Sequence, residues 1–472
     1  MIPMTLEEIA AATDGRRLPL RGGQSRAIPL VRSVSSDTRS AKAGDLFFAL
    51  RGANFDGHDF LPQAAEAGCA AAVVARERLG AEAEAMFPGG LIAVAETTAA
   101  LNALAAHHRR KARAKVIAVT GSNGKTTVKL MVHHVLSGRL KGSCSPKSFN
   151  NNIGVPLTLL SVEDDDDYVV CELGTNAPGE IAALGAVARP DLAVITSVSS
   201  THLEKLGSLE GVAAEKASIL GCLAEGGAAV VWADSDVLEQ SMRRYEGPVV
   251  RFGESPRADF RLTGYQSAGL AGRFEVNGSL WVALALPGRH NAVNALASLA
   301  VARHFGIAPA EAAASLGGFR GAEMRLQWIH AGSVTIINDA YNANPASMLA
   351  AADVLAEAPA SRRVMIVGDM RELGSRQRQL HLQTGVDIAA RTVDLLIGVG
   401  SLGRYIALGA AEAGIQTAAF ETLTDACRGI PALLRAGDAV LVKGSRAMGM
   451  EKLIEPIRAA FAQGAASAAD RG

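Results

Sequence analysis

A short segment, Gly121-Ser122-Asn123-Gly124-Lys125-Thr126-Thr127, combines the residue types that bind nucleotide phosphates. A strand is predicted before it over Val116–Thr120, and apolar residues at helical spacing follow it from Val128 to Leu136. Glycines let backbone N–H groups curl around phosphate oxygens, and a helix N-terminus adds positive potential. Lys125 can reach the β and γ phosphates, and Thr126 can ligate Mg²⁺. A plain glycine turn is the alternative, but the lysine and the hydroxyls would serve no purpose in it.

Two polar residues that follow other predicted strands could complete a metal site beside this loop. Glu172 ends the strand Tyr168–Glu172, and His202 follows the strand Leu192–Val198. In parallel α/β sheets, ligands bind outside the carboxyl ends of the strands. Together with Thr126, these residues offer oxygen and nitrogen ligands for a hard divalent cation that phosphate and water would also bind. Taken alone, Glu172 or His202 could equally be an ordinary surface residue.

Further polar residues lie at the ends of other predicted elements. Asn291 and Asn294 open an alanine-rich helix, where their amides could meet an adenine edge. Asp339 follows the strand Val334–Asn338 and could bind ribose hydroxyls. The loop Lys443-Gly444-Ser445-Arg446 is basic and rich in donors, which suits a carboxylate.

Three other segments have ordinary structural explanations. Lys216 lies in a predicted helix, where a lysine usually faces solvent. The three asparagines in Lys147–Gly154 can form a simple turn. The acidic run Asp164–Asp167 is predicted to be a solvated turn, since four adjacent acids cannot all face one metal ion.

The elements that must position these residues alternate between buried strands and amphipathic helices, which is typical of parallel α/β layers. Between Gly253 and Leu286 apolar and polar residues alternate, and the pair Asn277-Gly278 predicts a hairpin turn. A long helix is predicted from about Asn291 to Phe305, and shorter elements in the first hundred residues suggest a small α/β domain. Eight strands are predicted: Val116–Thr120, Tyr168–Glu172, Leu192–Val198, Ala228–Trp232, Val334–Asn338, Arg363–Val367, Leu395–Val399 and Ala439–Lys443.

Composition narrows the function class. A chain of 472 residues predicts about three domains. Its formal net charge of zero argues against a general nucleic-acid or anionic-membrane binder. Five scattered cysteines form no CxxC pair, so neither a disulfide framework nor a structural zinc site is expected. Without a recognisable signal peptide or membrane span, we expect a cytoplasmic protein.

The motifs together resemble the Mur ligases, ATP-dependent amide synthetases that build the peptide of bacterial cell wall precursors. The matching segments occur in family order along the whole chain: TGSNGKTT, SFNNNIGVP, the ELG strand end, LPGRHNAVNA, NDAYNANP and VKGSR. The segment GDMRELG followed by His381 favours the member type that adds D-alanyl-D-alanine to UDP-N-acetylmuramoyl-tripeptide. The stretch from Ser35 to Ala64 resembles the segment with which that type holds the UDP end.

The resemblance implies roles for individual residues. Lys125 matches the phosphate-loop lysine, while Thr126, Glu172 and His202 match magnesium ligands. Lys216 matches a lysine that takes up CO₂ as a carbamate and helps to hold a second magnesium, and the resemblance places Lys125, Lys216 and His202 in catalysis. The expected ATP-binding residues are Gly121 to Thr127, Asn291, Asn294, Arg325 and Asp339. The expected substrate-binding residues are Ser36, Asp37, Arg39, Asn151, Asn152, Asp369, Lys443, Ser445 and Arg446.

The family also implies an architecture and a reaction. Three α/β domains are expected: a small UDP-binding domain over 1–96, a central P-loop-type domain with a mainly parallel sheet over 97–323, and a C-terminal Rossmann-like domain over 324–472. ATP would phosphorylate the tripeptide carboxylate, and D-Ala-D-Ala would displace the phosphate. The cofactors implied are ATP and Mg²⁺. The third peptide residue, diaminopimelate or lysine, and the oligomeric state are not indicated by the sequence.

Some positions depart from the family pattern. Met324 stands where glycine is usual, and Lys147-Ser148-Phe149 replaces smaller residues. The phosphate loop is also short, because Val119 stands where the common G-x-x-x-x-G-K-[ST] pattern has its first glycine. Alternatives within the family are a folylpolyglutamate synthetase or a different muramyl ligase. An alternative outside enzymes is a nucleotide-binding switch or scaffold, against which the retained Lys125, Glu172, His202 and Lys216 argue.

Overall fold

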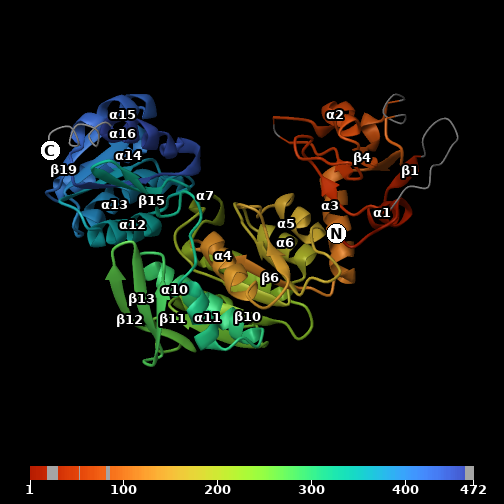
Figure 1. Cartoon of the computed structure of the whole chain (residues 1–472), viewed down its shortest axis with the longest axis horizontal. Helices are drawn as coiled ribbons and strands as arrows, with labels where there is room; N and C mark the ends of the chain where they lie inside the picture. Colours follow the sequence, from red (N-terminus) through yellow and green to blue (C-terminus); the bar gives the residue numbers. More distant parts are fainter. Residues whose placement is uncertain (19–29, 53, 81–85, 463–472) are drawn as a thin grey trace, which may run out of the picture.

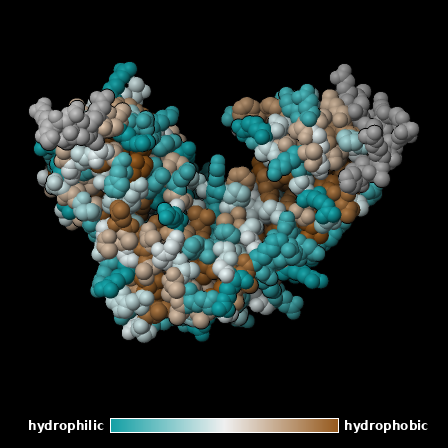
Figure 2. Space-filling model, viewed as in Figure 1, coloured by the Kyte–Doolittle hydropathy of each residue, from teal (hydrophilic) through white to brown (hydrophobic). Residues whose placement is uncertain are grey.

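The computed structural model describes residues 1–18, 30–52, 54–80 and 86–462. Its strands form three separate sheets, each in a lobe of its own (Figure 1). The N-terminal and C-terminal lobes stand on either side of a broad hollow above the central lobe (Figure 2). Among the described residues, no helix is long and apolar enough to cross a membrane.

The N-terminal sheet has the strand order β1-β5-β4-β3-β2 and is parallel except for β1. Glu96 caps the helix that follows, accepting from the N–H of Thr98 at 2.7 Å. This helix, α3, packs on α5 and α6 of the next lobe, so it links the first two sheets. The elements are α1 Leu6–Ala12, β1 Arg16–Leu18, β2 Val34–Ser35, β3 Leu46–Phe48, α2 Leu61–Glu66, β4 Ala71–Ala75, β5 Leu91–Val94 and α3 Thr97–Lys111.

The central sheet has nine strands in the order β14-β13-β12-β11-β10-β9-β6-β8-β7. Strands β7 to β12 run parallel with β6, whereas β12, β13 and β14 pair antiparallel. The strands are β6 Lys115–Thr120, β7 Gly142–Cys144, β8 Tyr168–Glu172, β9 Leu192–Ile195, β10 Ala228–Trp232, β11 Val249–Gly253, β12 Phe260–Ala268, β13 Ala271–Val276 and β14 Leu280–Leu284. The helices are α4 Lys125–Leu136, α5 Gly154–Leu160, α6 Glu180–Ala188, α7 Leu203–Leu206, α8 Leu209–Ala217, α9 Asp236–Ser241, α10 Arg289–His304 and α11 Pro309–Leu316.

Apolar side chains of β6 alternate between the two faces of this sheet. Ile117 and Val119 pack with α4, α10 and α11, and Val116 and Ala118 pack with the helices of the other face. Continuous burial on both faces explains why the central strand is an unbroken apolar run. It also fixes the direction in which the phosphate loop leaves the sheet.

The C-terminal sheet has the order β15-β16-β20-β17-β18-β19 and is parallel except for β15. Helices α12, α13 and α14 pack in one core cluster, and α15 and α16 pack in the cluster of the opposite face. The elements are β15 Gln327–Ala331, β16 Val334–Asp339, α12 Pro345–Glu357, β17 Arg362–Val367, α13 Gln377–Ala389, β18 Leu395–Val399, α14 Gly400–Glu412, β19 Gln416–Phe420, α15 Leu423–Gly429, β20 Asp438–Lys443 and α16 Ile454–Ala462.

The three-domain α/β class predicted from the sequence is confirmed, and the predicted hairpin turn at Asn277-Gly278 joins β13 to β14. Both turn residues have positive φ, 55° and 69°, as a tight hairpin turn requires. The domain boundaries at Glu96 and Glu323 stay predictions. One predicted strand, Leu192–Val198, is too long, since β9 ends at Ile195. The N–H of Thr196 still donates to Thr120 O at 2.9 Å, but the hydroxyls of Thr196 and Ser197 already donate to Asn123 O of the phosphate loop at 2.5 and 3.1 Å.

The buried ion pair between Arg362 and Asp438 gives a stability prediction for the C-terminal sheet. Arg362 Nη2 lies 2.7 Å from Asp438 Oδ2, and Asp438 also accepts from the N–H of Arg435 at 2.8 Å. Asp438→Ala leaves the half-buried guanidinium of Arg362 without its carboxylate partner, so we expect the free energy of unfolding to fall by about 3 kcal/mol. Hydrogen exchange of β17 and β20 amides measures it. Glu412→Ala, which removes an exposed carboxylate from α14, should leave the exchange unchanged.

Candidate functional site

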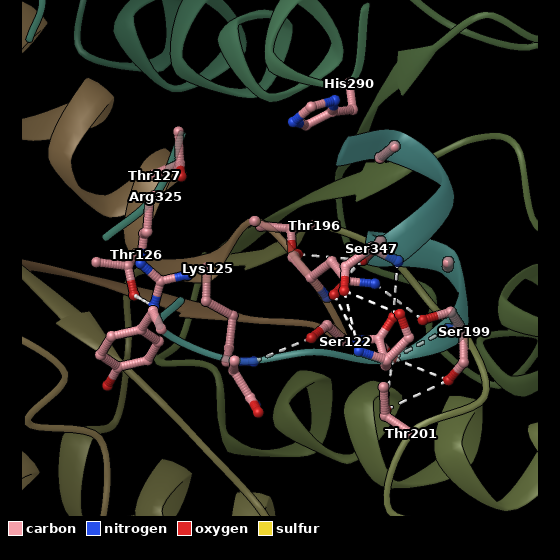
Figure 3. A pocket seen from close by; sticks show the side chains of 18 of the residues that line it. Ser122, Lys125, Thr126, Thr127, Thr196, Ser199, Thr201, His290, Arg325 and Ser347 are labelled. Carbon is pink, nitrogen blue, oxygen red and sulfur yellow. Dashed lines mark hydrogen bonds between the residues drawn. The ribbon is translucent and has the colours of Figure 1, made fainter. Parts of the chain in front are cut away.

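A cleft of about 1690 Å³ lies between the central and C-terminal lobes, which both contribute lining residues. The central lobe supplies the phosphate loop from Ser122 to Thr127, and Glu172 and His202 lie further along the wall. The C-terminal part of the chain supplies Arg325 and Asp339. Figure 3 shows the phosphate loop at close range, with Arg325 beside Thr126.

The conformation of the phosphate loop depends on its two glycines. Gly121 has φ +144°, and a Cβ there would lie 2.0 Å from the Thr196 hydroxyl. Gly124 has φ +81°, and a Cβ there would lie 2.4 Å from Asn294 Oδ1. Any larger residue would therefore meet both backbone strain and a clash. The loop follows β6, which lies between β8 and β9, so it sits where the chain crosses from one side of the sheet to the other.

Lys125 folds back over this loop. Its ammonium donates to the carbonyl of Gly121 at 2.8 Å and of Ser122 at 3.3 Å. Burial lowers the pKa of Lys125, because the charged form loses hydration. A phosphate in the loop would give this cation an anionic partner in place of two neutral carbonyls.

Thr126 joins three parts of the site. Its hydroxyl donates to Glu172 Oε2 at 2.8 Å and accepts from Arg325 Nη2 at 2.9 Å. The guanidinium of Arg325 also lies 4.1 Å from the ring centroid of Tyr341, a cation–π contact that fixes its direction. Met324 has φ +56°, which explains why glycine is the usual residue at that position.

Glu172 is 1% exposed, and each of its carboxylate oxygens accepts a hydrogen bond. Besides Thr126, it accepts from Asn150 Nδ2 at 3.0 Å, and Lys129 Nζ lies 3.5 Å away. A buried carboxylate beside a hydroxyl is a hard oxygen donor set, which fits Mg²⁺. His202 lines the same cleft, but its Nδ1 contacts Glu372 of the C-terminal lobe.

The predicted nucleoside-binding residues surround the same cleft. Asn291 and Asn294 are buried at the start of α10, and Asn294 Nδ2 donates to Asn291 Oδ1 at 3.3 Å. Asn291 Nδ2 donates to Pro287 O at 2.7 Å, which ties the helix start to the preceding turn. Asp339 Oδ2 lies 2.5 Å from Lys443 Nζ, and its other oxygen accepts from Leu326 N at 3.1 Å.

The predicted peptide-side residues divide into two groups. Lys443, Ser445 and Arg446 line the cleft, as do Asn151 and Asn152. Asp369 does not line it within the described structure. Its buried carboxylate instead accepts from the N–H groups of Leu402 and Gly403 at 2.9 and 2.8 Å, at the start of α14. This placement gives Asp369 a supporting position behind the cleft.

The residues predicted to bind uridine lie in the N-terminal lobe, away from this cleft. Arg39 Nη2 lies 2.6 Å from Asp37 Oδ2, and this pair lowers the pKa of Asp37. Ser36 is half-buried beside them. No contact brings these three residues to the phosphate loop among the described parts of the chain.

Lys216 is only 1% exposed, which contradicts the solvated-face explanation. Burial lowers its pKa well below the usual value, and the charge of Lys125 adds to this effect. Its neighbour Glu215 accepts from Gly179 N at 2.7 Å and Ile181 N at 2.8 Å, which fixes α8 against α6. Lys216 is not among the residues that line the cleft in the described structure.

Several residues in or beside the cleft were not predicted from the sequence; Lys129 lies behind the cleft lining, next to Glu172. Lys129 follows Lys125 by one helical turn, is fully buried, and donates to the carbonyl of Ser145 at 2.7 Å. Asn344 Nδ2 donates to Asn123 Oδ1 at 2.7 Å, a further bond between the lobes. The sequence offered two signs of these residues: Asn344 belongs to the NDAYNANP motif, and Lys129 follows Lys125 by four residues on the same helix. Nothing local distinguished Glu372.

The acidic run beside β8 forms a surface cluster. Glu163, Asp165 and Asp166 lie close enough together for a metal ion. Lys141 lies 2.9 Å from Glu163 and 2.5 Å from Asp165, so a lysine already balances much of their charge. Glu163 and Asp165 are exposed, as a solvated turn requires, whereas Asp166 is buried and accepts from the N–H of Glu163 at 2.8 Å.

Gly124→Ala tests the geometry of the phosphate loop. The added methyl group would displace Asn294, so we expect ADP affinity to fall by at least tenfold. Isothermal titration calorimetry with MgADP measures it. Gly226→Ala is the matched control, because Gly226 also has positive φ, +72°, but no atom lies within 4 Å of its added Cβ. Equal ADP affinity of both variants would contradict the loop geometry.

Comparisons with known proteins match almost the whole chain. Three models of one family cover it in order: the Mur ligase family catalytic domain over residues 30–119, the Mur ligase middle domain over 119–302, and the Mur ligase glutamate ligase domain over 324–446. The UDP-N-acetylmuramoyl-tripeptide--D-alanyl-D-alanine ligase of Bacillus subtilis is 34% identical, with 97% of this chain and 99% of the relative covered. The enzyme of the same name from Escherichia coli is 36% identical, with the same coverage.

Solved structures agree with the sequence relatives. A crystal structure of MurF from Acinetobacter baumannii superimposes with a TM-score of 0.86 at 31% identity, covering 97% of this chain and 99% of that one. MurF ligase from Thermotoga maritima in complex with ADP superimposes with a TM-score of 0.80 at 25% identity, covering 92% and 98%. The cleft, the order of the domains and these full-length similarities lead to one conclusion: the chain belongs to the Mur ligase family.

Proposed function

We propose that this chain is an ATP-dependent, ADP-forming ligase that adds D-alanyl-D-alanine to UDP-N-acetylmuramoyl-tripeptide. The product is the UDP-muramoyl-pentapeptide precursor of peptidoglycan. Relatives of that printed name match it over nearly their full length. The structural observation that supports the proposal is the contact of Thr126 with both Glu172 and Arg325, which joins residues of two lobes that would bind nucleotide and metal.

The chemistry requires a carboxylate to attack the γ-phosphorus of ATP. The carboxylate oxygen forms a bond to phosphorus, and the bond from phosphorus to the β-phosphate oxygen breaks, giving ADP and an acyl phosphate. The amine of D-Ala-D-Ala then attacks the acyl carbon and loses one proton, and inorganic phosphate leaves. Three groups of this chain would hold the charges: Lys125 at the phosphates, Arg325 beside them, and the loop around Arg446 at the substrate carboxylate.

Thr126, Glu172 and His202 would hold Mg²⁺, which neutralises phosphate charge when bound. Lys216 would carry a carbamate. A neutral lysine amine adds to CO₂ and loses one proton, which gives an anionic oxygen ligand. Burial of Lys216 and the nearby positive charge of Lys125 favour the neutral amine that this addition needs.

The remaining substrate groups have separate places. Ser36, Asp37 and Arg39 would hold the uridine end in the N-terminal lobe, so the UDP-tripeptide would extend from that lobe toward the cleft. Asn151 and Asn152 would meet the peptide, with Lys443, Ser445 and Arg446 on the opposite wall. Asp369 would support these residues, since its main-chain oxygen accepts from Ser445 N at 3.1 Å. A cytoplasmic location stays a prediction.

The direct assay is phosphate release from MgATP. We expect release only when both UDP-N-acetylmuramoyl-tripeptide and D-Ala-D-Ala are present, with one pentapeptide formed for each phosphate. Release that needs the tripeptide and a single amino acid would indicate a different muramyl ligase. Release with neither would indicate a nucleotide-binding switch.

Lys125→Ala should lower kcat by about 10²–10³-fold, because the lost cation acts on charge that develops during phosphoryl transfer. Steady-state kinetics at saturating ATP measures the change, and circular dichroism checks the fold. Lys115→Ala serves as control, since this lysine is exposed at the opposite end of β6. A kcat close to that of the unchanged enzyme would contradict the role of Lys125.

Lys216→Ala should abolish activity, and acetate or a longer carboxylic acid should restore part of it by refilling the ligand position. In parallel, ¹³C NMR with labelled bicarbonate should show a carbamate signal in the unchanged protein and none in the variant. Lys205→Ala removes an exposed lysine from α7 and should change neither result. Full activity of Lys216→Ala without added acid refutes the carbamate.

A further inference from the structure

Glu372 lies in the loop Gly368–Gly374, after β17 of the C-terminal sheet, and lines the cleft. The chemistry described above gives it no role. Its carboxylate contacts Nδ1 of His202, a residue 170 positions earlier in the chain and in the central lobe.

The backbone on both sides of this contact is unusual. His202 has φ +54° and Glu372 has φ +64°, a region that non-glycine residues rarely adopt. Such conformations persist where the surrounding structure enforces them, and they concentrate at functional sites. Here they turn two side chains from different lobes toward each other.

The loop that carries Glu372 is held from behind. The N–H of Met370 donates to Nε2 of the buried His381 at 2.8 Å, and the N–H of Arg371 donates to the Ser445 hydroxyl at 2.9 Å. The main-chain oxygen of Glu372 accepts from the N–H of Glu204 at 3.5 Å. Two lobes are thus in backbone contact beside the His202–Glu372 pair, and the carboxylate has a fixed place.

The chemistry of imidazole gives this contact a consequence. When Nδ1–H donates to a carboxylate, the proton stays on Nδ1, and the lone pair of Nε2 is free to bind a metal. Within the part of the chain that the structure describes, Nε2 of His202 has no hydrogen-bond partner. Glu372 therefore orients the imidazole ring through Nδ1 and leaves Nε2 available to bind a metal ion.

We propose that Glu372 is a positioning residue for the metal site: by accepting the Nδ1–H of His202, it holds the ring so that Nε2 binds the divalent cation. The proposal rests on the proposed function, in which His202 is a magnesium ligand. Because Glu372 belongs to the C-terminal lobe, the metal site is complete only when that lobe meets α7. Closure of the nucleotide cleft and metal binding are then one coupled event.

The first test measures Mn²⁺ binding by electron paramagnetic resonance in the presence of ADP. Glu372→Ala should raise the Kd for Mn²⁺ about 10–100-fold, the usual effect of losing a carboxylate that orients a ligating histidine. Glu372→Gln should have a smaller effect, because the carboxamide oxygen still accepts the Nδ1–H. The control is Glu204→Gln, which removes an exposed carboxylate from the same interface and should bind Mn²⁺ like the unchanged chain.

Two further variants separate this proposal from the proposed function. If Glu372 acts through His202, the double variant His202→Ala/Glu372→Ala should bind Mn²⁺ no more weakly than His202→Ala alone. Weak binding by His202→Ala with unchanged binding by Glu372→Ala overturns the positioning role and leaves the metal site intact. Unchanged Mn²⁺ binding by His202→Ala overturns both the positioning role of Glu372 and the role of His202 as a metal ligand.

A second measurement needs neither metal nor an altered Glu372. The ring nitrogens of ¹⁵N-histidine-labelled protein are recorded by NMR at about pH 9, where a histidine of ordinary pKa is neutral. His202 is identified by the signals that disappear in His202→Gln. We expect the Nδ1–H tautomer for His202 in the unchanged chain. The Nε2–H tautomer would overturn the proposal.

Discussion

The hydroxyl of Thr126 is the point on which the cleft depends. It donates to Glu172 on the neighbouring strand and accepts from Arg325 of the C-terminal part of the chain. A hydroxyl has only one proton to donate, so the hydrogen bond to the buried carboxylate fixes the orientation of the O–H bond. One side chain therefore connects the phosphate loop, the central sheet and the first residues of the C-terminal lobe.

Buried charges organise the rest of the cleft, and each is paired. Glu172 has Lys129 beside it, and Asp339 has Lys443. The free energy lost when such charged groups leave water can exceed the attraction between them, so buried ion pairs contribute little to stability. They do give the site a fixed electrostatic field before substrate arrives, which is what stabilises charge during phosphoryl transfer. Lys125, which is half-buried, and Lys216, which is buried, are the exceptions: burial lowers the pKa of both amines, and no carboxylate forms an ion pair with either among the described residues.

Local features of this site were predictable from the sequence because each depends on a few consecutive residues. The phosphate loop follows from glycines and a lysine between an apolar strand and an amphipathic helix, and Glu172 follows from its place at a strand end. The edge strands β15 and β19 were not predicted, since their half-exposed side chains give no continuous apolar run. Glu372 was not predicted, because its contact with His202 joins distant segments and such contacts leave no periodic pattern. Arg325, which also contacts another lobe, was predicted only through the family resemblance. The departure at Met324 became intelligible only through its positive φ.

The destination of the γ-phosphoryl group decides whether this cleft performs the proposed chemistry. The tripeptide can be labelled with ¹⁸O at its terminal carboxylate, and the phosphate released during ligation can be analysed by mass spectrometry. Attack of the carboxylate on ATP predicts one ¹⁸O atom in each phosphate, because the oxygen that bonded to phosphorus leaves with it. Phosphate without ¹⁸O, in an assay that forms pentapeptide, would contradict an acyl phosphate at this site.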